Sequence, residues 1–283
     1  MTVLMFPGQG CQKIGMDPEL VKRFPLLFEE ASSALNEDIV AIASNDLIHD
    51  TRYTQPVLFT YHHAAYQAWL DMNHDDVTMV MGHSLGEYNA LLAAGVITFS
   101  EGIQLVVKRA ALMADMNQGG MSAVLGLPID VVSQGVDVCQ KHGILDVANH
   151  NELTQIVVSG ELNAIDHFHQ WATDAGAKRV VPLKVSGAFH SRLMTEAAES
   201  FALFAQHLLQ GDRAISVPVI ANVTALPYDS IDLLSLLSRQ IKSPVRWYES
   251  LLYVISEGRS NFHEINAGIP VLSKIARRMQ RSS

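Results

Sequence analysis

Residues 77–94 constrain the fold of this chain more than any other stretch. Residues 77–81 (VTMVM) form a short apolar run rich in strand formers, which is too short for a helix. The sequence Gly-His-Ser-Leu-Gly follows at 82–86, and the helix-forming residues 87–94 end at Gly95. This order predicts a sharp strand-to-helix turn, a nucleophile elbow, that lifts Ser84 above the end of a sheet. A glycine-rich turn with a capping serine is the alternative interpretation.

Apolar and amphipathic segments elsewhere predict an α/β protein with a parallel sheet. A capping box at 98–101 begins a helix that runs to about residue 116. Strands that alternate with helices are typical of a sheet whose strands run parallel. Further strands are expected at 3–6, 217–221 and 261–265, and further helices at 19–35, 55–70, 191–209, 233–240, 247–256 and 271–279.

The pattern changes after the break at 117–120. From residue 121 the order becomes β-α-β-β-α-β, which is ferredoxin-like. We therefore expect a ferredoxin-like small domain at 121–186, inserted into a large α/β domain made of residues 1–120 and 187–283. Its strands are expected at 122–126, 145–149, 154–159 and 179–184, and its helices at 129–142 and 162–175.

Composition excludes several classes of protein. The 283 residues are 48% hydrophobic and 17% charged, as in a globular protein large enough for one or two domains. The net charge of −9 argues against general nucleic-acid binding, and no apolar run is long enough to cross a membrane. Two cysteines cannot form a disulfide framework, and the first residues lack the basic start of a secretory signal, so we expect a cytoplasmic protein.

A serine nucleophile needs a base, and the chain offers twelve histidines. His83 adjoins Ser84 and is expected to point away from it, whereas His190 follows a predicted strand in a loop of small residues. Most acidic residues between 84 and 190 fall in the inserted domain. A Ser–His dyad and a triad with an acidic residue both remain open at this point.

Other polar residues allow a second part of a site and no metal centre. Arg109 lies on the flank of the apolar face of its helix, where either an arginine at a cleft edge or a surface arginine fits. The glycine-rich loop at 7–10 is expected to border a site, because it lacks the ending of a phosphate-binding loop. The histidine pairs at 62–63 and 167–169 do not share a helix face, so no metal site is predicted.

Five motifs occur together along the chain. They are FPGQGCQ at 6–12, GHSLGEYNAL at 82–91, Lys108-Arg109, SGAFHS at 186–191 and SRQIKSPVRW at 238–247. This combination resembles the malonyl-CoA:acyl carrier protein transacylase family, including the free-standing, trans-acting acyltransferases of polyketide synthases. The resemblance covers nearly the whole chain and implies an α/β-hydrolase-like large domain.

The resemblance implies the catalytic groups. Ser84 is expected to be the acyl-accepting nucleophile and His190 its general base and acid. The main-chain carbonyl of Gln240 is expected to orient the imidazole, so that no acidic residue is needed. Gln9, with the backbone N–H groups of Gln9 and Leu85, is expected to form the oxyanion hole.

The resemblance also implies the substrates. Arg109 is expected to bind the malonyl carboxylate, and Phe189 corresponds to the malonyl-selecting form of the family. The implied reaction is a ping-pong transfer from malonyl-CoA to the phosphopantetheine thiol of an acyl carrier protein. It needs no cofactor, and the chain is expected to be a monomer active in fatty-acid or polyketide biosynthesis.

The chain departs from the family pattern in two places. The family often has Ser at the position of Cys11, and its usual E-x-G-P-G reads Glu-Ile-Asn-Ala-Gly at 264–268, without the proline. Neither departure affects Ser84, His190 or Arg109.

Two rival functions remain open. An acyl hydrolase of the same fold would clear acyl groups from carrier proteins, but such relatives are expected to lack Arg109. The second rival is a non-catalytic interaction module.

Docking of an acidic carrier protein to this acidic chain is expected to need a local basic patch. Candidate clusters are Lys178 with Arg179, and Lys274, Arg277, Arg278 and Arg281 near the C-terminal end. A solvated basic tail is the alternative.

Overall fold

The computed structural model describes residues 1–229 and 232–282, and the side chains of residues 1–229 and 232–280. Its strands are β1 (Thr2–Phe6), β2 (Val77–Gly82), β3 (Gly120–Leu125), β4 (Leu145–Glu152), β5 (Gln155–Gly160), β6 (Arg179–Pro182), β7 (Val219–Ile220) and β8 (Phe262–Glu264). Its α-helices are α1 (Pro18–Arg23), α2 (Pro25–Leu35), α3 (Ile39–Ala43), α4 (Thr51–Met72), α5 (Gly86–Ala93), α6 (Phe99–Asp115), α7 (Ile129–Cys139), α8 (Leu162–Asp174), α9 (Thr195–Leu208), α10 (Leu233–Lys242), α11 (Trp247–Ser256) and α12 (Leu272–Ser282). Short 3-10 helices are η1 (Asp46–His49), η2 (Gln140–His142) and η3 (Arg192–Met194).

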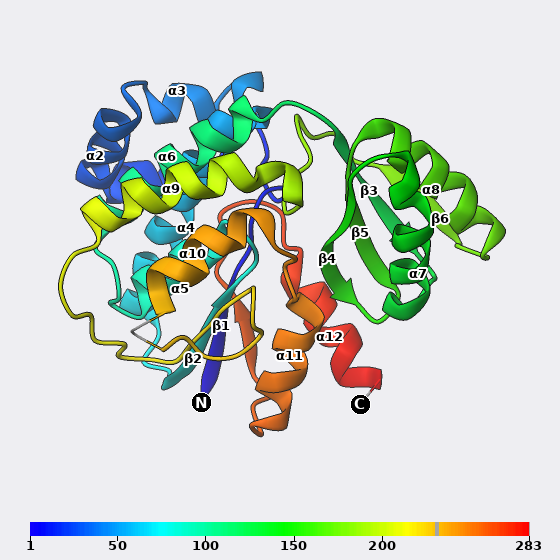
Figure 1. Ribbon diagram of the computed structural model, residues 1–283. Helices are drawn as coiled ribbons and strands as arrows, with labels where there is room; N and C mark the ends of the chain where they lie inside the picture. Colours follow the sequence, from blue (N-terminus) through cyan, green and yellow to red (C-terminus); the bar gives the residue numbers. More distant parts are fainter. Residues whose placement is uncertain (230–231, 283) are drawn as a thin grey trace.

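A parallel sheet with the strand order β7-β2-β1-β8 forms the centre of the larger part of the molecule (Figure 1). Alternate residues of β1 pack on opposite sides of it. Leu4 and Phe6 belong to the core shared with α4, α5 and α6, whereas Val3 and Met5 belong to the core shared with α11 and α12. Burial of both faces explains the apolar run in this strand. The loops that follow β1 and β2 meet at the carboxyl edge of the sheet, where α/β proteins place their sites.

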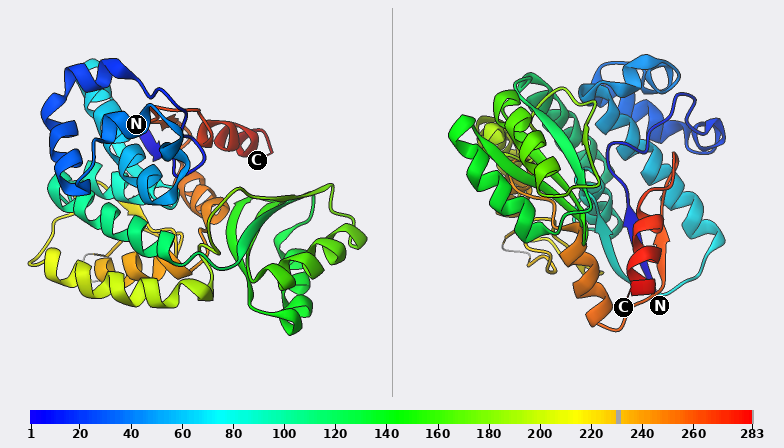
Figure 2. Two further views of the ribbon diagram at one scale, coloured as in Figure 1. Left: turned by 90° about the horizontal axis from the view of Figure 1, so that it is seen from above. Right: turned by 90° about the vertical axis from the view of Figure 1, so that its right-hand side faces the viewer.

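A second, antiparallel sheet has the order β4-β5-β3-β6 and forms its own core with α7 and α8. Val124, Ile156 and Phe168 are fully buried in this core. The strand order and directions are those of a ferredoxin-like unit. Figures 1 and 2 show this unit to one side of the parallel sheet. The predicted fold class is confirmed, while the boundaries 1–120, 121–186 and 187–283 stay a prediction.

Glycines let the loop after β1 pack closely against the turn after β2. A Cβ on Gly86 would lie 2.0 Å from the carbonyl oxygen of Phe6, and a Cβ on Gly82 would lie 2.0 Å from that of Gly86. A Cβ on Gly8 would lie 2.5 Å from the carbonyl oxygen of His83. Only glycine therefore allows these backbone segments to approach so closely, and their contact fixes the elbow beside the first loop.

The structure departs from the predicted helices mainly before the elbow. The predicted helix 19–35 is two helices, α1 and α2, divided at Phe24. Pro25 causes the division, because proline lacks an N–H and disfavours helical backbone in the residue before it. Helix α4 begins at Thr51, earlier than the predicted residue 55, and α3 and η1 were not predicted.

The later helices agree more closely with the prediction. The capping box at 98–101 is confirmed, with hydrogen bonds in both directions between Thr98 and Glu101. The predicted helix 191–209 begins as η3 and is α-helical only from Thr195.

The glycine contacts predict a large stability difference between two similar substitutions. Gly86→Ala is expected to lower the free energy of unfolding by about 3 kcal/mol or more, because the added methyl group meets rigid backbone. Gly120→Ala is the matched control, since its nearest neighbour is a terminal methyl group of the Leu162 side chain at 3.2 Å. It is expected to cost less than about 1 kcal/mol. Urea denaturation measures both, and equal losses would contradict the close-packing account.

Candidate active site

The hydroxyl of Ser84 and the imidazole of His190 meet although 106 positions separate them in the chain. Ser84 Oγ lies 2.8 Å from His190 Nε2. Both residues have left-handed backbone, with φ of 52° and 59°. This conformation costs a residue with a side chain on the order of 1–3 kcal/mol and persists only where the surroundings enforce it. The elbow and the loop before η3 thus direct two strained residues toward one another.

A main-chain carbonyl orients the imidazole. His190 Nδ1 lies 2.8 Å from the carbonyl oxygen of Gln240 on α10 and must donate its proton there, because a carbonyl only accepts. Nε2 therefore carries the lone pair that accepts the proton of Ser84 Oγ–H. This arrangement fits the dyad that the sequence left open beside a triad. Burial, together with the charge of Arg109, lowers the pKa of His190 to about 3, so the imidazole is neutral at ordinary pH.

Arg109 lies buried beside the serine, with 1% of its surface exposed, so the surface alternative is wrong. Its Nη2 donates to Ser84 Oγ and to Gln240 Oε1, both at 3.0 Å, and its Nη1 donates to Gln55 Oε1. These acceptors are all uncharged, and Nε has no partner among the described residues. Burial lowers the pKa of the guanidinium, but an arginine stays charged in proteins. A planar cation without a bonded anion therefore lies next to the hydroxyl.

The two N–H groups predicted for the oxyanion hole lie in segments that the glycines hold together. Gln9 belongs to the loop after β1, and Leu85 directly precedes α5. Within the described part of the chain, no acceptor takes either backbone N–H. The Gln9 side chain donates one N–H of Nε2 to Thr51 Oγ1 at 3.1 Å. Both backbone N–H groups are thus available to an oxyanion, and the role predicted for the Gln9 side chain stays a prediction.

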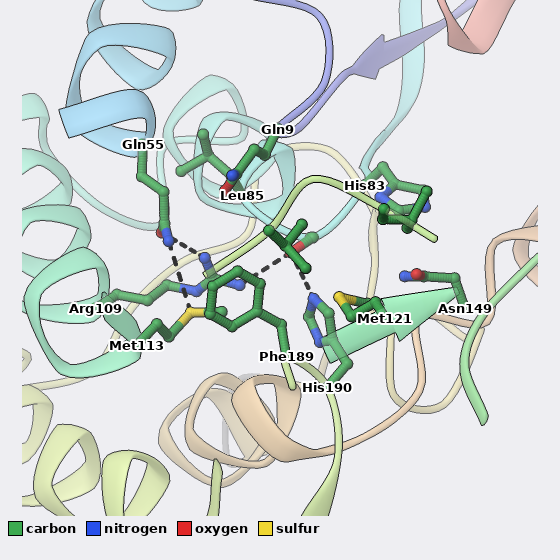
Figure 3. A pocket seen from close by; sticks show the side chains of 13 residues that line it. Gln9, Gln55, His83, Leu85, Arg109, Met113, Met121, Asn149, Phe189 and His190 are labelled. Atoms are coloured by element: carbon green, nitrogen blue, oxygen red, sulfur yellow. Dashed lines mark hydrogen bonds between the residues drawn. The ribbon is translucent and has the colours of Figure 1, made fainter. Parts of the chain in front are cut away.

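Residues of the antiparallel sheet, together with loops and helices at the carboxyl edge of the parallel sheet, form the walls of a pocket around these groups (Figure 3). Met113 and Phe189 lie on the side of Arg109, and Figure 3 shows Met121 and Asn149 on the opposite side. The pocket is therefore mostly apolar, with a cation at one end. Its shape suits a short acyl chain that ends in an anion.

The sequence analysis missed several polar residues that hold the site. Asn222, which follows β7, accepts the N–H of Ser84 through Oδ1 at 2.7 Å and donates through Nδ2 to the carbonyl of Gly82 at 2.6 Å. Gln55 holds the guanidinium, and Glu87 lies fully buried next to the elbow. The sequence did hold an indication of Glu87, since it is the one acidic residue of helix α5 (Gly86–Ala93) and directly follows the elbow. The sequence held no such indication for Asn222 or Gln55, because no local pattern links these residues to the elbow.

The two departures from the family pattern contact one histidine. His62 Nε2 lies 3.5 Å from Cys11 Sγ, and His62 Nδ1 lies 3.4 Å from the backbone nitrogen of Ala267. Ala267 N–H must donate, so Nδ1 accepts and Nε2 carries the proton toward the sulfur. A proline at 267 would have no N–H for this contact. The histidine thereby ties the loop after β1 to the loop after β8, which explains how both departures fit.

His62 is a structural histidine, because burial lowers its pKa to about 3 and keeps it neutral. In residues 1–229 and 232–282, no cluster of three or more His, Cys, Asp or Glu side chains could hold a metal ion. No helix of that same part is long and apolar enough to cross a membrane.

The geometry suits acyl transfer through an ester on Ser84. The imidazole can remove the hydroxyl proton, and the backbone N–H groups can hold the oxyanion of a tetrahedral intermediate. The α/β fold and this site together fit the class of acyltransferases that use a serine nucleophile.

Comparisons with known proteins specify the family. The acyl transferase domain family matches residues 3–281. The polyketide biosynthesis malonyl CoA-acyl carrier protein transacylase BaeC of Bacillus velezensis is 41% identical over 276 residues, which are 95% of this chain and 93% of BaeC. The polyketide biosynthesis protein ThaF of Burkholderia thailandensis is 39% identical over 282 residues, which are 99% of this chain but 24% of ThaF.

Solved structures of malonyl transacylases have the same fold as this chain. The malonyl CoA-acyl carrier protein transacylase of Burkholderia pseudomallei superposes with a TM-score of 0.92 at 33% identity, covering 100% of this chain and 99% of that one. PlMCAT, solved in complex with the type II polyketide synthase acyl carrier protein AntF, gives a TM-score of 0.92 at 31% identity, with 99% and 93% coverage. The chain belongs to the malonyl-CoA:acyl carrier protein transacylase family, and the resemblance inferred from the motifs is confirmed.

The lowered pKa of His190 predicts an unusual pH dependence. The base is neutral above its folded pKa, so the acylation rate with an acetyl donor is expected to stay level from about pH 8 down to about pH 5, below the ordinary histidine value of about 6.5. Arg109→Ala removes a positive charge that lowers the pKa of His190, so this pKa should rise. The fall of the rate at low pH, the acid limb of the profile, should then begin at higher pH. Stopped-time intact-mass spectrometry measures the rates.

Lys108→Ala removes a charge from the same helix and is the control for this experiment. It is expected to leave the acid limb where the unaltered enzyme has it. An acid limb near pH 6.5 in the unaltered enzyme, or the same shift in the control, would contradict the prediction.

Proposed function

We propose that this chain transfers a malonyl group from malonyl-CoA to the phosphopantetheine thiol of an acyl carrier protein, through a malonyl ester on Ser84. The observation that carries the proposal is the placement of Arg109. Among the described residues, its buried guanidinium donates to the uncharged groups of Gln55, Ser84 and Gln240, and it lies 3.0 Å from the oxygen that would carry the acyl group. A buried cation is costly unless an anion pairs with it, and a planar guanidinium pairs both oxygens of a carboxylate. A malonyl group supplies that carboxylate close to its ester carbonyl.

The first half of the reaction forms the acyl-enzyme. His190 Nε2 takes the hydroxyl proton as Ser84 Oγ attacks the thioester carbonyl. The backbone N–H groups of Gln9 and Leu85 hold the oxyanion, and the carbonyl of Gln240 stabilises the imidazolium through Nδ1–H. The C–S bond breaks, and the imidazolium gives its proton to the leaving coenzyme A thiolate.

The second half repeats these steps in reverse. The phosphopantetheine thiol gives its proton to His190, and its sulfur attacks the ester carbonyl. Ser84 Oγ leaves and recovers a proton from the imidazolium. Between the two halves the ester must be protected from water, which the narrow pocket and the pairing of the malonyl carboxylate with Arg109 favour.

Arg109 also weighs against the acyl hydrolase alternative. A hydrolase that clears many acyl groups gains nothing from a buried cation in the acyl pocket, which would disfavour uncharged chains. The comparisons favour transfer as well, because the named relatives of similar length are malonyl transacylases.

We extend the proposal to the setting of the enzyme. The residues assigned above use no cofactor, since every proton and acyl step falls on Ser84, His190 or the two substrates. All assigned residues lie within one chain, which fits a monomer. Cys11 and Cys139 are both free and buried, which fits a cytoplasmic location.

Exposed cations are the proposed docking surface for the carrier protein. Lys178 and Arg179 are exposed at the start of β6, and Lys274 and Arg277 are exposed on α12. Arg278 is engaged elsewhere, in an ion pair with Glu152 of β4. The side chain of Arg281, predicted as part of the second cluster, lies outside the described residues.

Arg109→Ala tests the proposed function. It is expected to lower kcat/KM for malonyl-CoA by about 100-fold or more, because two charge-assisted hydrogen bonds to the carboxylate are lost. Acetyl transfer is expected to persist. Arg109→Lys is the matched control, which keeps the charge but not the planar fork. Its kcat/KM for malonyl-CoA should lie between those of Arg109→Ala and the unaltered enzyme. Intact-mass spectrometry with a panel of acyl-CoAs measures acylation. Equal losses of kcat/KM for malonyl and acetyl donors would contradict the assignment of Arg109 to the malonyl carboxylate.

Charge reversal tests the docking surface. Replacing Lys178 and Arg179 by Glu, or Lys274 and Arg277 by Glu, is expected to raise KM for the carrier protein about tenfold in at least one double variant. Acylation by malonyl-CoA should be unchanged in both, which controls for folding. Unaltered carrier-protein kinetics in both double variants would rule out the basic clusters.

A further inference from the structure

One buried acidic residue at the site has no part in the chemistry described above. Glu87 lies in the first turn of α5, with 0% of its surface exposed. Its Oε1 accepts hydrogen bonds from the Tyr228 hydroxyl at 2.6 Å and from the backbone N–H of Asn222 at 3.1 Å, and its Oε2 accepts one from Gln240 Nε2. Three donors stabilise the charged form of this carboxylate, whereas its complete removal from water favours the protonated form.

The side chain of Gln240 connects this carboxylate to the arginine of the acyl pocket. Gln240 Oε1 accepts from Arg109 Nη2, while Gln240 Nε2 donates to Glu87 Oε2. Among the described residues, Arg109 from α6 and Tyr228 from the segment after β7 lower the pKa of Glu87, and Glu87 in turn raises the pKa of Tyr88 on its own helix. Glu87 is thus the buried anion that balances the charge of Arg109, through one bridging amide.

A malonyl carboxylate disturbs this balance. Without substrate, and with Glu87 ionised, Glu87 and Arg109 together carry no net charge. Once a malonyl carboxylate pairs with Arg109, two anions share one buried cation. Two carboxylates in one buried site cannot both remain ionised cheaply, so the pKa of one of them rises.

We propose that binding of the malonyl carboxylate at Arg109 is coupled to uptake of one proton by Glu87. This inference rests on the proposed function, because it requires the carboxylate to meet Arg109. The proton comes from solvent and forms an O–H bond on Glu87 Oε1. The Tyr228 hydroxyl rotates so that its oxygen accepts a hydrogen bond from this O–H, and the proton stays on Glu87, while Oε2 keeps its hydrogen bond from Gln240. The proton leaves again when the malonyl group passes to the carrier protein.

The pKa of Glu87 lies in the range that this role requires. Burial raises its pKa to about 7, against the lowering effect of its hydrogen-bond donors and of Arg109. Below that value the free enzyme already holds the proton, so malonyl affinity is level. Above it, affinity falls as pH rises, by up to about tenfold per pH unit, until the higher pKa of the bound state is passed. Acetyl donors, which bring no carboxylate, show no such fall.

Proton uptake on binding tests the proposal directly. Ser84→Ala blocks acylation, and malonyl-pantetheine serves as the ligand because it lacks the phosphates of coenzyme A, which titrate near neutral pH. Calorimetric titration at about pH 7.5 in buffers of different ionisation enthalpy gives the number of protons taken up. For Ser84→Ala, uptake of a measurable fraction of one proton per bound malonyl-pantetheine is expected. No uptake is expected when Glu87→Gln is added to this variant. Acetyl-pantetheine is the control ligand.

A pH profile supplies a second readout that does not depend on tight binding. In the otherwise unaltered enzyme, kcat/KM for malonyl-pantetheine relative to acetyl-pantetheine is expected to fall above about pH 7 and to be level in Glu87→Gln. Tyr228→Phe removes one donor to the carboxylate and raises its pKa, so the fall should begin at higher pH. This second variant keeps the ring and the Glu87 side chain, which guards against a folding defect in the first.

The outcomes separate this inference from the proposed function. Malonyl binding without proton uptake, a level kcat/KM ratio in the unaltered enzyme, or the same uptake in Glu87→Gln would overturn the coupling and leave malonyl transfer intact. An enzyme that forms no malonyl ester would overturn the proposed function, and the coupling with it.

Discussion

The buried charge of Arg109 is the interaction on which the rest of this site depends. A guanidinium removed from water is costly unless its surroundings replace the lost solvation. Here the amides of Gln55 and Gln240 and the hydroxyl of Ser84 do so with hydrogen bonds, without an anion in direct contact. The site is therefore built around a cation whose direct hydrogen-bond partners are neutral and whose balancing carboxylate, Glu87, lies one amide away, which leaves the guanidinium free to pair with a substrate carboxylate.

The neutral arrangement around His190 follows from the same constraint. The carbonyl of Gln240 orients the imidazole without placing an acidic residue in the acyl pocket, where it would compete with a malonyl carboxylate for Arg109. The carboxylate of Glu87 lies behind the amide of Gln240 rather than in the pocket. Gln240 thus serves the base through its backbone and the arginine through its side chain.

The sequence predicted the parts of the site that lie in local patterns. The elbow at Ser84 follows from a strand, two glycines and a helix in immediate succession, and the ferredoxin-like unit from its order of segments. The division at Pro25 was also open to prediction, since proline and the residue before it resist helix. The sequence could not reveal Asn222 or Gln55, because their contacts join positions 138 and 54 apart through packing. The burial of Arg109 likewise needed tertiary structure, since its helical phase left it at the edge of the apolar face.

A crystal structure of the malonylated enzyme, trapped without carrier protein, tests the central claim most directly. The account predicts an ester on Ser84 Oγ, its carbonyl oxygen at the N–H groups of Gln9 and Leu85, and the malonyl carboxylate paired with the guanidinium of Arg109. A malonyl carboxylate directed into solvent, with the hydrogen bonds of Arg109 unchanged, would contradict it.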